Sequence, residues 1–301
     1  MKNLAVSIAG VVLKNPVMPA SGTFGSGRMY SKFVDLSKLG AVAVKGVSME
    51  PWEGNPPHRI AETPSGILNS IGLQNPGVEA WLDSDLPFLR RFDTKIIVNI
   101  CGHTMDECAA VAQRLKSEPV DMLELNISCP NVSAGGMAFG LSADTVEKVV
   151  SAVKKSSMQP LIVKLSPNVT SIADIAKAAE ASGADALSLI NTVMGMQIDI
   201  HKRRPTLSNA IGGLSGPAIR PVAVRMVYQA ARAVSIPIIG MGGIVDSDGA
   251  IEFLMAGATA VAVGTANFGN PSVMLEIIDG ISKFMDENGV SDVNDFKKMM
   301  E

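Results

Sequence analysis

One local pattern recurs along most of the chain: a helix-like segment, a glycine, and then a short apolar run rich in β-branched residues. It is clearest at 38–46, 181–191 and 255–265. The glycine suits the left-handed turn that ends a helix, and the apolar run suits a strand buried on both faces of a parallel sheet. A chain that alternates helices with such strands is expected to form a parallel sheet covered by helices.

Eight apolar runs of this kind occur, at 16–20, 41–45, 96–100, 121–126, 161–165, 186–191, 236–241 and 260–264. Between them, Thr104, Ser142 and Ser171 precede segments with helical periodicity and suit N-cap positions. Eight strand–helix units fit a closed TIM (β/α)8 barrel better than an open doubly wound sheet, which stays the alternative. Because no linker or low-complexity tract divides the chain, we expect 1–301 to form one barrel domain.

The composition excludes several classes of protein. Hydrophobic residues make up 47% of the chain and aromatic residues only 4%, so the core must be aliphatic. A net charge of −3 gives no electrostatic case for nucleic acid or an anionic membrane as partner, and no apolar run is long enough to span a bilayer. The three cysteines contain no CxxC pair, and the histidines show no metal-binding spacing. We therefore expect a cytoplasmic protein without a metal site.

Two long segments, 46–77 and 194–216, are rich in glycine and follow the second and sixth apolar runs. We interpret both as irregular loops over the carboxyl ends of the strands. Long loops are usually functional, although a surface elaboration or a subunit contact is the alternative. The basic run at 201–204 suits a solvated face, with anion or partner binding as the less favoured interpretation.

The apolar runs end in polar residues or glycine. In a barrel, active sites lie where the strands run into the following loops. Lys45 and Lys164 each end an apolar run, although a core would reject an unpaired charge there. A helix cap or a solvent-exposed side chain would explain any one of these residues, but not all eight ends together. The ends predict the rim of one polar pocket: Ser21, Lys45, Asn99, Asn126, Lys164, Asn191 with Thr192, Gly242 with Gly243, and Gly264 with Thr265.

Glycine-rich turns at 240–249 and 264–271 follow the last two runs. Backbone N–H groups in such turns bind anions, and barrels frequently hold a phosphate in these two loops, although ordinary turn glycines are the alternative. Cys129 follows the fourth run within NISCPNV. A lone cysteine is more often a small buried hydrophobic residue, but the position on the rim makes a catalytic role an equal alternative. We expect Cys101 and Cys108 to be structural.

Seven segments occur in the order AVAVKGVS, NSIGLQNPG, NISCPNV, INTV, GGLSGPAIRP, GMGGI and VAVGTA. This ordered set resembles the dihydroorotate dehydrogenases of class 1 and covers nearly the whole chain. The stretches SAGGMAFG and IDIHKRRPTLSNAIGGLSGPAIRP are most similar to the NAD-dependent 1B type, in particular to its FMN-bearing catalytic subunit.

The resemblance implies oxidation of (S)-dihydroorotate to orotate in de novo pyrimidine (UMP) biosynthesis, with Cys129 as the base and FMN as the hydride acceptor. The residues that match FMN-binding positions of the family are Ser21, Lys45, Gly46, Asn99, Asn126, Lys164, Ile190, Gly216, Gly242, Gly243, Gly264 and Thr265. The residues that match pyrimidine-binding positions are Lys45, Asn69, Ser70, Ile71, Gly72, Leu73, Asn126, Asn191 and Thr192.

The 1B type also implies a partner subunit that carries FAD and a [2Fe-2S] cluster, in a heterotetramer built on a homodimer of this chain. The chain itself offers neither a set of cluster ligands nor a dinucleotide-binding motif. The alternatives are a fumarate-dependent class 1A enzyme, the pyrimidine-reducing domain of dihydropyrimidine dehydrogenase, a Schiff-base aldolase that uses Lys45 or Lys164, and a non-enzymatic regulatory barrel that binds a phosphate ligand.

Overall fold

Eight parallel strands form a nearly closed barrel in the computed structural model, which describes residues 2–128 and 139–300. The strands are β3 (Val17–Pro19), β4 (Ala41–Ala43), β7 (Lys95–Ile100), β8 (Met122–Asn126), β9 (Leu161–Lys164), β10 (Ala186–Leu189), β15 (Ile238–Met241) and β16 (Ala260–Val263). Their order in space is β3-β16-β15-β10-β9-β8-β7-β4. The Gly40 N–H donates to Val17 O at 3.0 Å, which joins the two outermost strands. All eight apolar runs are therefore confirmed as barrel strands.

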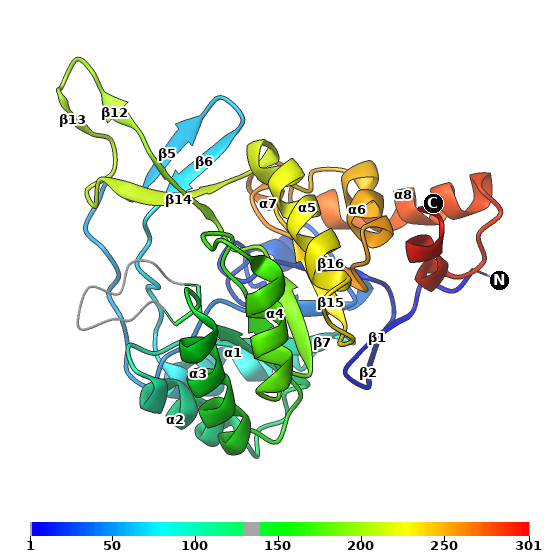
Figure 1. Cartoon of the computed structure of the whole chain (residues 1–301), viewed down its shortest axis with the longest axis horizontal. Coiled ribbons are helices and arrows are strands. Elements are labelled where there is room, and N and C mark those ends of the chain that lie inside the picture. Colours follow the sequence, from blue (N-terminus) through cyan, green and yellow to red (C-terminus); the bar gives the residue numbers. More distant parts are fainter. Residues whose placement is uncertain (1, 129–138, 301) are drawn as a thin grey trace.

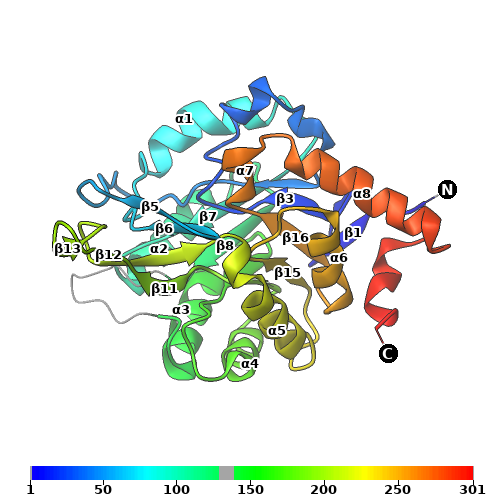
Figure 2. The same cartoon turned by 90° about the horizontal axis from the view of Figure 1, so that it is seen from above.

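Helices cover the outside of the barrel (Figures 1 and 2). They are α1 (Val78–Leu89), α2 (Met105–Leu115), α3 (Ala143–Ser156), α4 (Ile172–Ala181), α5 (Arg220–Ala231), α6 (Ser247–Met255), the short α7 (Ala266–Gly269) and α8 (Val273–Glu287). The side chains of Thr104, Ser142 and Ser171 cap α2, α3 and α4, as predicted. The first crossover contains only the 3-10 turns η1 (Tyr30–Lys32) and η2 (Leu36–Lys38). Two further 3-10 segments are η3 (Pro217–Ile219) and η4 (Val293–Lys298).

The core is aliphatic, as the low aromatic content predicted. On α3, four valines at helical spacing are fully buried against the barrel, and the strands contribute residues such as Val98 and Val163 at 0% exposure. Each such side chain stabilises the fold by roughly 1.5–3 kcal/mol relative to an exposed position. No helix in the described ranges is long and apolar enough to cross a membrane.

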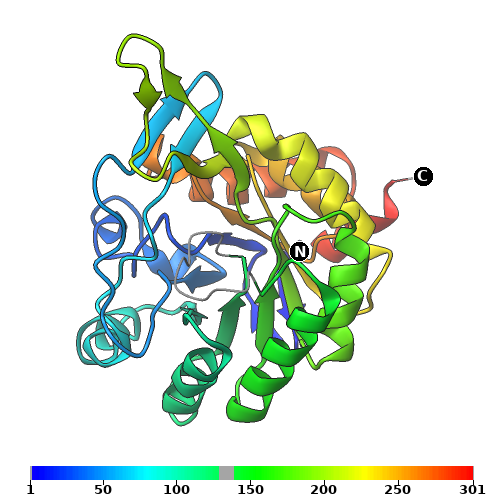
Figure 3. The same ribbon diagram turned by 60° about the vertical axis from the view of Figure 1, so that its left-hand side comes forward.

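The two long segments are not irregular, and that expectation was wrong. They form one antiparallel sheet in the order β11-β14-β6-β5, made of β5 (Ile60–Thr63), β6 (Gly66–Asn69), β11 (Val193–Met196) and β14 (Ile211–Ser215). We call it the roof sheet. Its central pair, β6 with β14, joins the two segments, and the hairpin of β12 (Ile198–Asp199) and β13 (Arg204–Pro205) extends beyond it (Figures 1 and 3). Pairing between such distant segments leaves no local signal in the sequence.

A short hairpin of β1 (Val6–Ile8) and β2 (Val11–Leu13) precedes β3 in the chain. It leads into the amino end of that strand, the end away from the cavity. Ile8 and Leu13 are fully buried in the hairpin. Both chain ends lie on this side of the molecule, away from the roof sheet (Figure 1), and the Asn3 N–H donates to Ser291 O at 2.8 Å. The polar strand ends and the roof sheet therefore share one end of the barrel, and apolar packing closes the other.

Candidate active site

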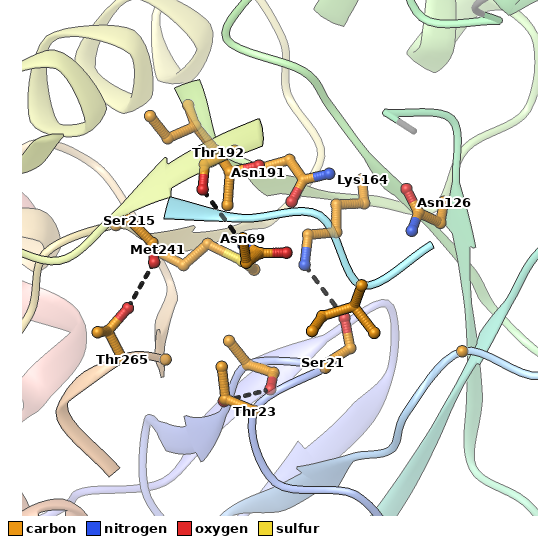
Figure 4. A pocket seen from close by; sticks show the side chains of 18 of the residues that line it. Ser21, Thr23, Asn69, Asn126, Lys164, Asn191, Thr192, Ser215, Met241 and Thr265 are labelled. Carbon is orange, nitrogen blue, oxygen red and sulfur yellow. Dashed lines mark hydrogen bonds between the residues drawn. The ribbon is translucent and has the colours of Figure 1, made fainter. Parts of the chain in front are cut away.

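The strand ends and the roof sheet enclose a cavity of about 410 Å³ (Figure 4). That volume is within the usual range for sites that bind small molecules or cofactors. The site residues expected from the sequence that line it are Ser21, Lys45, Gly46, Asn69, Ile71, Gly72, Leu73, Asn99, Asn126, Lys164, Ile190, Asn191, Thr192, Gly216, Gly242, Gly243, Gly264 and Thr265. The structure thus brings the expected residues together, while their separate roles toward cofactor and substrate stay predictions.

Ser70 is the one expected residue within the described ranges that does not line the cavity. It is buried at 1% exposure and lies between two lining residues, Asn69 and Ile71. Cys129 lies outside the described residues. Its neighbour Ser128 is buried and donates its hydroxyl proton to Lys164 O at 2.7 Å.

Other lining residues escaped the sequence reasoning. Some flank an expected residue, and others belong to the roof sheet, whose pairing the sequence does not show. Thr265 Oγ1 donates to Ser215 Oγ at 2.8 Å and so ties the end of β16 to the roof sheet. The full additional set is Ala20, Gly22, Thr23, Ile60, Gly213, Ser215, Ile219, Met241 and Phe268.

Lys164 brings a buried positive charge to the cavity. The residue is 4% exposed, and its Nζ donates to Ser21 Oγ at 3.1 Å. No carboxylate in the described part of the chain forms a salt bridge with it. Burial of an ammonium without a charged partner costs several kcal/mol. The arrangement is suited to a ligand that carries or acquires negative charge.

Glu124 is a further polar residue that the sequence reasoning missed. It is 3% exposed and lies inside the barrel. It precedes Asn126 by two positions in β8, so both side chains are on the same face of that strand. Its Oε2 accepts from Ser21 Oγ at 2.9 Å and from Asn99 Nδ2 at 2.5 Å, and its Oε1 accepts from Ser188 Oγ at 2.7 Å. Side chains of a strand alternate between its two faces, and this alternation could have placed Glu124 inside the barrel. The neighbouring residues of β8 are apolar, however, so the sequence indicated only a buried strand.

The glycine turns allow close backbone approaches beside the cavity. Gly242 and Gly243 have φ values of 129° and 76°, which favour glycine. A Cβ on Gly243 would lie 2.8 Å from Gly216 O. The turn after β15 lies next to Gly264 and Thr265, which follow the adjacent strand β16. Backbone N–H groups of neighbouring turns of this kind are suited to hold a phosphate.

Amide side chains from the roof sheet and from the strand ends also line the cavity (Figure 4). Asn69 Nδ2 donates to Gly213 O at 3.3 Å, and Asn126 Oδ1 accepts from the Ser128 N–H at 3.1 Å. Asn191 and Thr192 follow β10 and also line the cavity. Amide groups offer donors and acceptors together, so these side chains are suited to a planar ring with alternating N–H and C=O edges.

The remaining cysteines and the basic run are not among the residues that line the cavity. Cys108 is buried on α2, and burial raises the pKa of its thiol to about 12, so the thiol stays protonated. Cys101 is 1% exposed and donates to Val47 O at 3.4 Å. In the basic run, Lys202 pairs with Asp199 at 3.2 Å on the exposed β12–β13 hairpin.

Comparison with known proteins gives the family. The sequence model of a family described as dihydroorotate dehydrogenase matches residues 3–285. The chain belongs to the dihydroorotate dehydrogenase family. This family member is 62% identical over 294 residues to a protein of Alkaliphilus oremlandii named dihydroorotate dehydrogenase B (NAD(+)), catalytic subunit, an alignment that covers 98% of this chain and 97% of the relative. A protein of Lachnoclostridium phytofermentans with the same name is 60% identical over 293 residues, with 97% and 98% covered.

A solved structure confirms the fold of the family member. The dihydroorotate dehydrogenase of Eimeria tenella, in complex with ferulenol, superposes with a TM-score of 0.80. The match covers 97% of this chain and 87% of the other at 24% sequence identity. The TIM barrel predicted from the eight apolar runs is therefore confirmed.

Proposed function

We propose that this chain is the catalytic subunit of an NAD-dependent dihydroorotate dehydrogenase, which oxidises (S)-dihydroorotate to orotate in de novo pyrimidine biosynthesis. The relatives of 60% identity and more that bear this name, aligned over nearly the whole chain, support the assignment. The observation that carries it is the cavity itself, where the buried Lys164, a wall of amides and two glycine turns meet.

The cavity fits FMN. The turns at Gly242–Gly243 and Gly264–Thr265 offer backbone N–H groups for a phosphate, and the close approach at Gly243 leaves no room for a side chain. Lys164, whose Nζ donates to Ser21 Oγ at 3.1 Å, and Lys45 are the lysines of the described lining and supply positive charge there. FMN, when bound, supplies the hydride acceptor, and the protein supplies position and electrostatics. We assign the binding of FMN to the residues that match the FMN-binding positions of the family.

The chain's own residues would handle the proton and the substrate. Oxidation of dihydroorotate removes a proton from one ring carbon and a hydride from its neighbour. We assign the proton to Cys129, because a thiolate can act as a general base near neutral pH. Asn69, Asn126 and Asn191, with Thr192, would bind the polar edges of the pyrimidine, and Lys45 would contact both substrate and cofactor.

Lys164 has a separate task in this scheme. Its ammonium donates to the Ser21 hydroxyl at the cavity wall. A fixed positive charge costs no reorganisation when negative charge develops beside it, so it favours reduction of the cofactor. The Schiff-base alternative assigns the same lysine to covalent catalysis.

The name of the relatives as a catalytic subunit implies a separate partner subunit. We propose that the partner carries FAD and a [2Fe-2S] cluster and passes the electrons to NAD. We further propose a heterotetramer built on a homodimer of this chain. A cytoplasmic location, where thiols stay reduced, fits a chain with so few cysteines and no CxxC pair.

We also propose that 1–301 fold as a single domain. One cluster of buried apolar residues extends from Val6 to Phe296 and includes residues of all eight barrel strands. A continuous core of this kind is expected to unfold cooperatively. A single transition followed in parallel by circular dichroism and by fluorescence would support the proposal, and two separated transitions would contradict it.

Anaerobic mixing of the purified flavin-containing protein with dihydroorotate tests the proposed function. We expect the visible absorbance of the flavin to bleach and orotate to form in a one-to-one ratio. Free FMN with dihydroorotate, without protein, is the control and should not bleach. An unchanged flavin spectrum would contradict the proposal. Reoxidation of the bleached protein by fumarate would favour the class 1A alternative, whereas transfer to NAD only with the partner subunit would support the 1B type.

A further inference from the structure

The buried carboxylate of Glu124 has no part in the chemistry proposed above. It does not line the cavity, and no Lys, Arg or His nitrogen in the described ranges forms a salt bridge with it. Removal of a carboxylate from water costs several kcal/mol, and an apolar side chain in the same place often stabilises a core more. Stability of the barrel therefore does not explain why a glutamate occupies this buried position.

The hydrogen bonds of Glu124 lead to the cavity. The Ser21 hydroxyl carries one proton, which it donates to Glu124 Oε2 at 2.9 Å. Its lone pairs then accept from Lys164 Nζ at 3.1 Å and from Asn99 Nδ2 at 3.2 Å. Because Asn99 also donates to Glu124, the carboxylate fixes the hydroxyl, and the hydroxyl fixes the ammonium. Ser21 and Lys164 both line the cavity, where Figure 4 shows the bond between them.

The same bonds join two opposite charges through one hydroxyl. Glu124 and Lys164 are 3% and 4% exposed, so solvent screens neither of them well. The negative charge below the cavity wall then offsets part of the positive charge that Lys164 presents within it. Interactions of this kind are strong in the interior, because the effective dielectric is low and the hydrogen bonds polarise one another.

We infer that Glu124 is a positioning residue that sets how much positive charge Lys164 presents to the bound flavin, and thereby sets the reduction potential of that flavin. The inference rests on the proposed function, since it takes FMN as the ligand of the cavity. The reduced cofactor is the more negative form, so the uncompensated charge of Lys164 would favour it. Glu124 lowers the potential and helps the electrons to leave for the next acceptor.

The substitution Glu124→Gln tests the inference, because it removes the charge and keeps the shape. The amide oxygen can accept from Ser21 and Asn99, and the amide nitrogen can donate to the Ser188 hydroxyl, which is able to accept. We expect the variant to bind reduced FMN about tenfold more tightly relative to oxidised FMN. For a two-electron couple this ratio is a shift of about 30 mV to more positive potential.

Glu124→Asp is the second variant. It keeps the charge but withdraws it by one methylene from Ser21, so we expect a shift partway in the same direction, about threefold in the ratio or roughly 15 mV. The potentials are measured by anaerobic titration of the bound flavin against reference dyes. If Glu124→Gln does not fold, the Asp variant decides the question alone.

Ser188→Ala is the matched control. It removes the third hydrogen bond of Glu124, keeps the charge and changes no residue that lines the cavity. A purely structural role for Glu124 predicts that all three variants melt at lower temperature with the potential of the wild type, and this result would overturn the inference. A wild-type protein that binds no FMN would instead overturn the proposed function and the inference with it. A flavin-containing wild type with unmoved potentials in the variants counts against the inference alone.

Discussion

The two ends of the barrel use the same chemical groups in opposite ways. At the carboxyl end, Glu124 and Lys164 are almost completely buried and joined through the Ser21 hydroxyl at the cavity wall. At the amino end, Asp185 and Lys154 form an ion pair whose side chains are 33% and 36% exposed. Asp185 also accepts the Leu161 N–H at 2.7 Å and so holds the start of β9. One pair lies at the wall of the cavity, and the other lies where a strand begins.

The amino end repeats this use of carboxylates. Asp121, just before β8, accepts the Ile96 N–H of β7 at 2.8 Å. Glu180, at the end of α4, accepts the Ser235 N–H at 2.8 Å. Each carboxylate ties one element to the start of a neighbouring strand. In barrels of this type the amino end serves stability and the carboxyl end serves chemistry, so substitutions at the two ends should separate these properties.

The largest effect is expected for Cys129→Ser, in the loop that follows β8. Serine is a much weaker base than cysteine, so turnover with dihydroorotate should fall by about 10²–10⁴-fold at neutral pH. The flavin content and the melting temperature should stay those of the wild type. Steady-state kinetics and the flavin spectrum check both parts, and undiminished turnover would remove Cys129 as the base.

Alanine substitutions of two lysines, one at each end of the barrel, test whether the two ends have different roles. Lys164→Ala should weaken FMN binding by about 10–100-fold, since a charged hydrogen bond contributes roughly 1.5–3 kcal/mol. Lys154→Ala, at the amino end, should leave FMN binding unchanged and lower the melting temperature by a few degrees. Titration of the apoproteins with FMN measures the first effect and thermal unfolding the second. Normal flavin content and normal reduction kinetics in Lys164→Ala would refute the role of that residue.

Gly46→Ala should reduce FMN binding by about tenfold through Asn99. A Cβ at this position would lie 2.7 Å from Asn99 Oδ1, so the amide must move, at a cost of about 1–3 kcal/mol for overpacking. The control is Gly269→Ala, where a Cβ would meet nothing within 4 Å. Fluorescence titration with FMN compares the two variants. Equal affinities would show that the packing of Gly46 against Asn99 does not matter for binding.

Asp185→Ala should act on stability alone. It removes the acceptor of the Leu161 N–H and the partner of Lys154, so we expect the free energy of unfolding to fall by about 1–3 kcal/mol. The turnover of the folded variant should match that of the wild type. Urea denaturation and kinetics at low temperature provide the two measurements. A loss of turnover without a loss of stability would contradict the division between the two ends.

The smallest effect concerns pH. The hydrogen bond from the Ser235 side chain, followed by the N–H groups of Ser235 and Ile236, lowers the pKa of Glu180. A lowered pKa in the folded state means that the contribution is fully present above the unfolded pKa and is lost as the pH falls through the folded pKa. Because Glu180 is largely solvated, the loss should stay within about 1 kcal/mol. Stability curves of the wild type and Glu180→Gln, measured from neutral pH down to acid pH, should converge at the acid end. A constant gap between the curves would rule out this titration.

Most of the barrel, and most of the cavity lining contributed by the carboxyl ends of its strands, could be predicted from the sequence, because both depend on local signals. An apolar run followed by a polar residue marks a strand and its carboxyl end, and the chain order of the runs gives the barrel. The roof sheet could not be predicted in this way. Asn69 and Gly213 are register partners although they are far apart in sequence, so neither segment alone shows its partner. Glu124 was missed for another reason, since one charge within an apolar run does not reveal which partners surround it.

The roof sheet makes the two long segments structurally dependent on each other. β6 and β14 are neighbours in one sheet, so each segment supplies half of the hydrogen bonds that shape the upper wall of the cavity. A change of length or register in one segment leaves the backbone groups of the other without partners. The two segments therefore depend on each other although they are far apart in the sequence, and a graft of the upper cavity wall into another barrel would have to carry both.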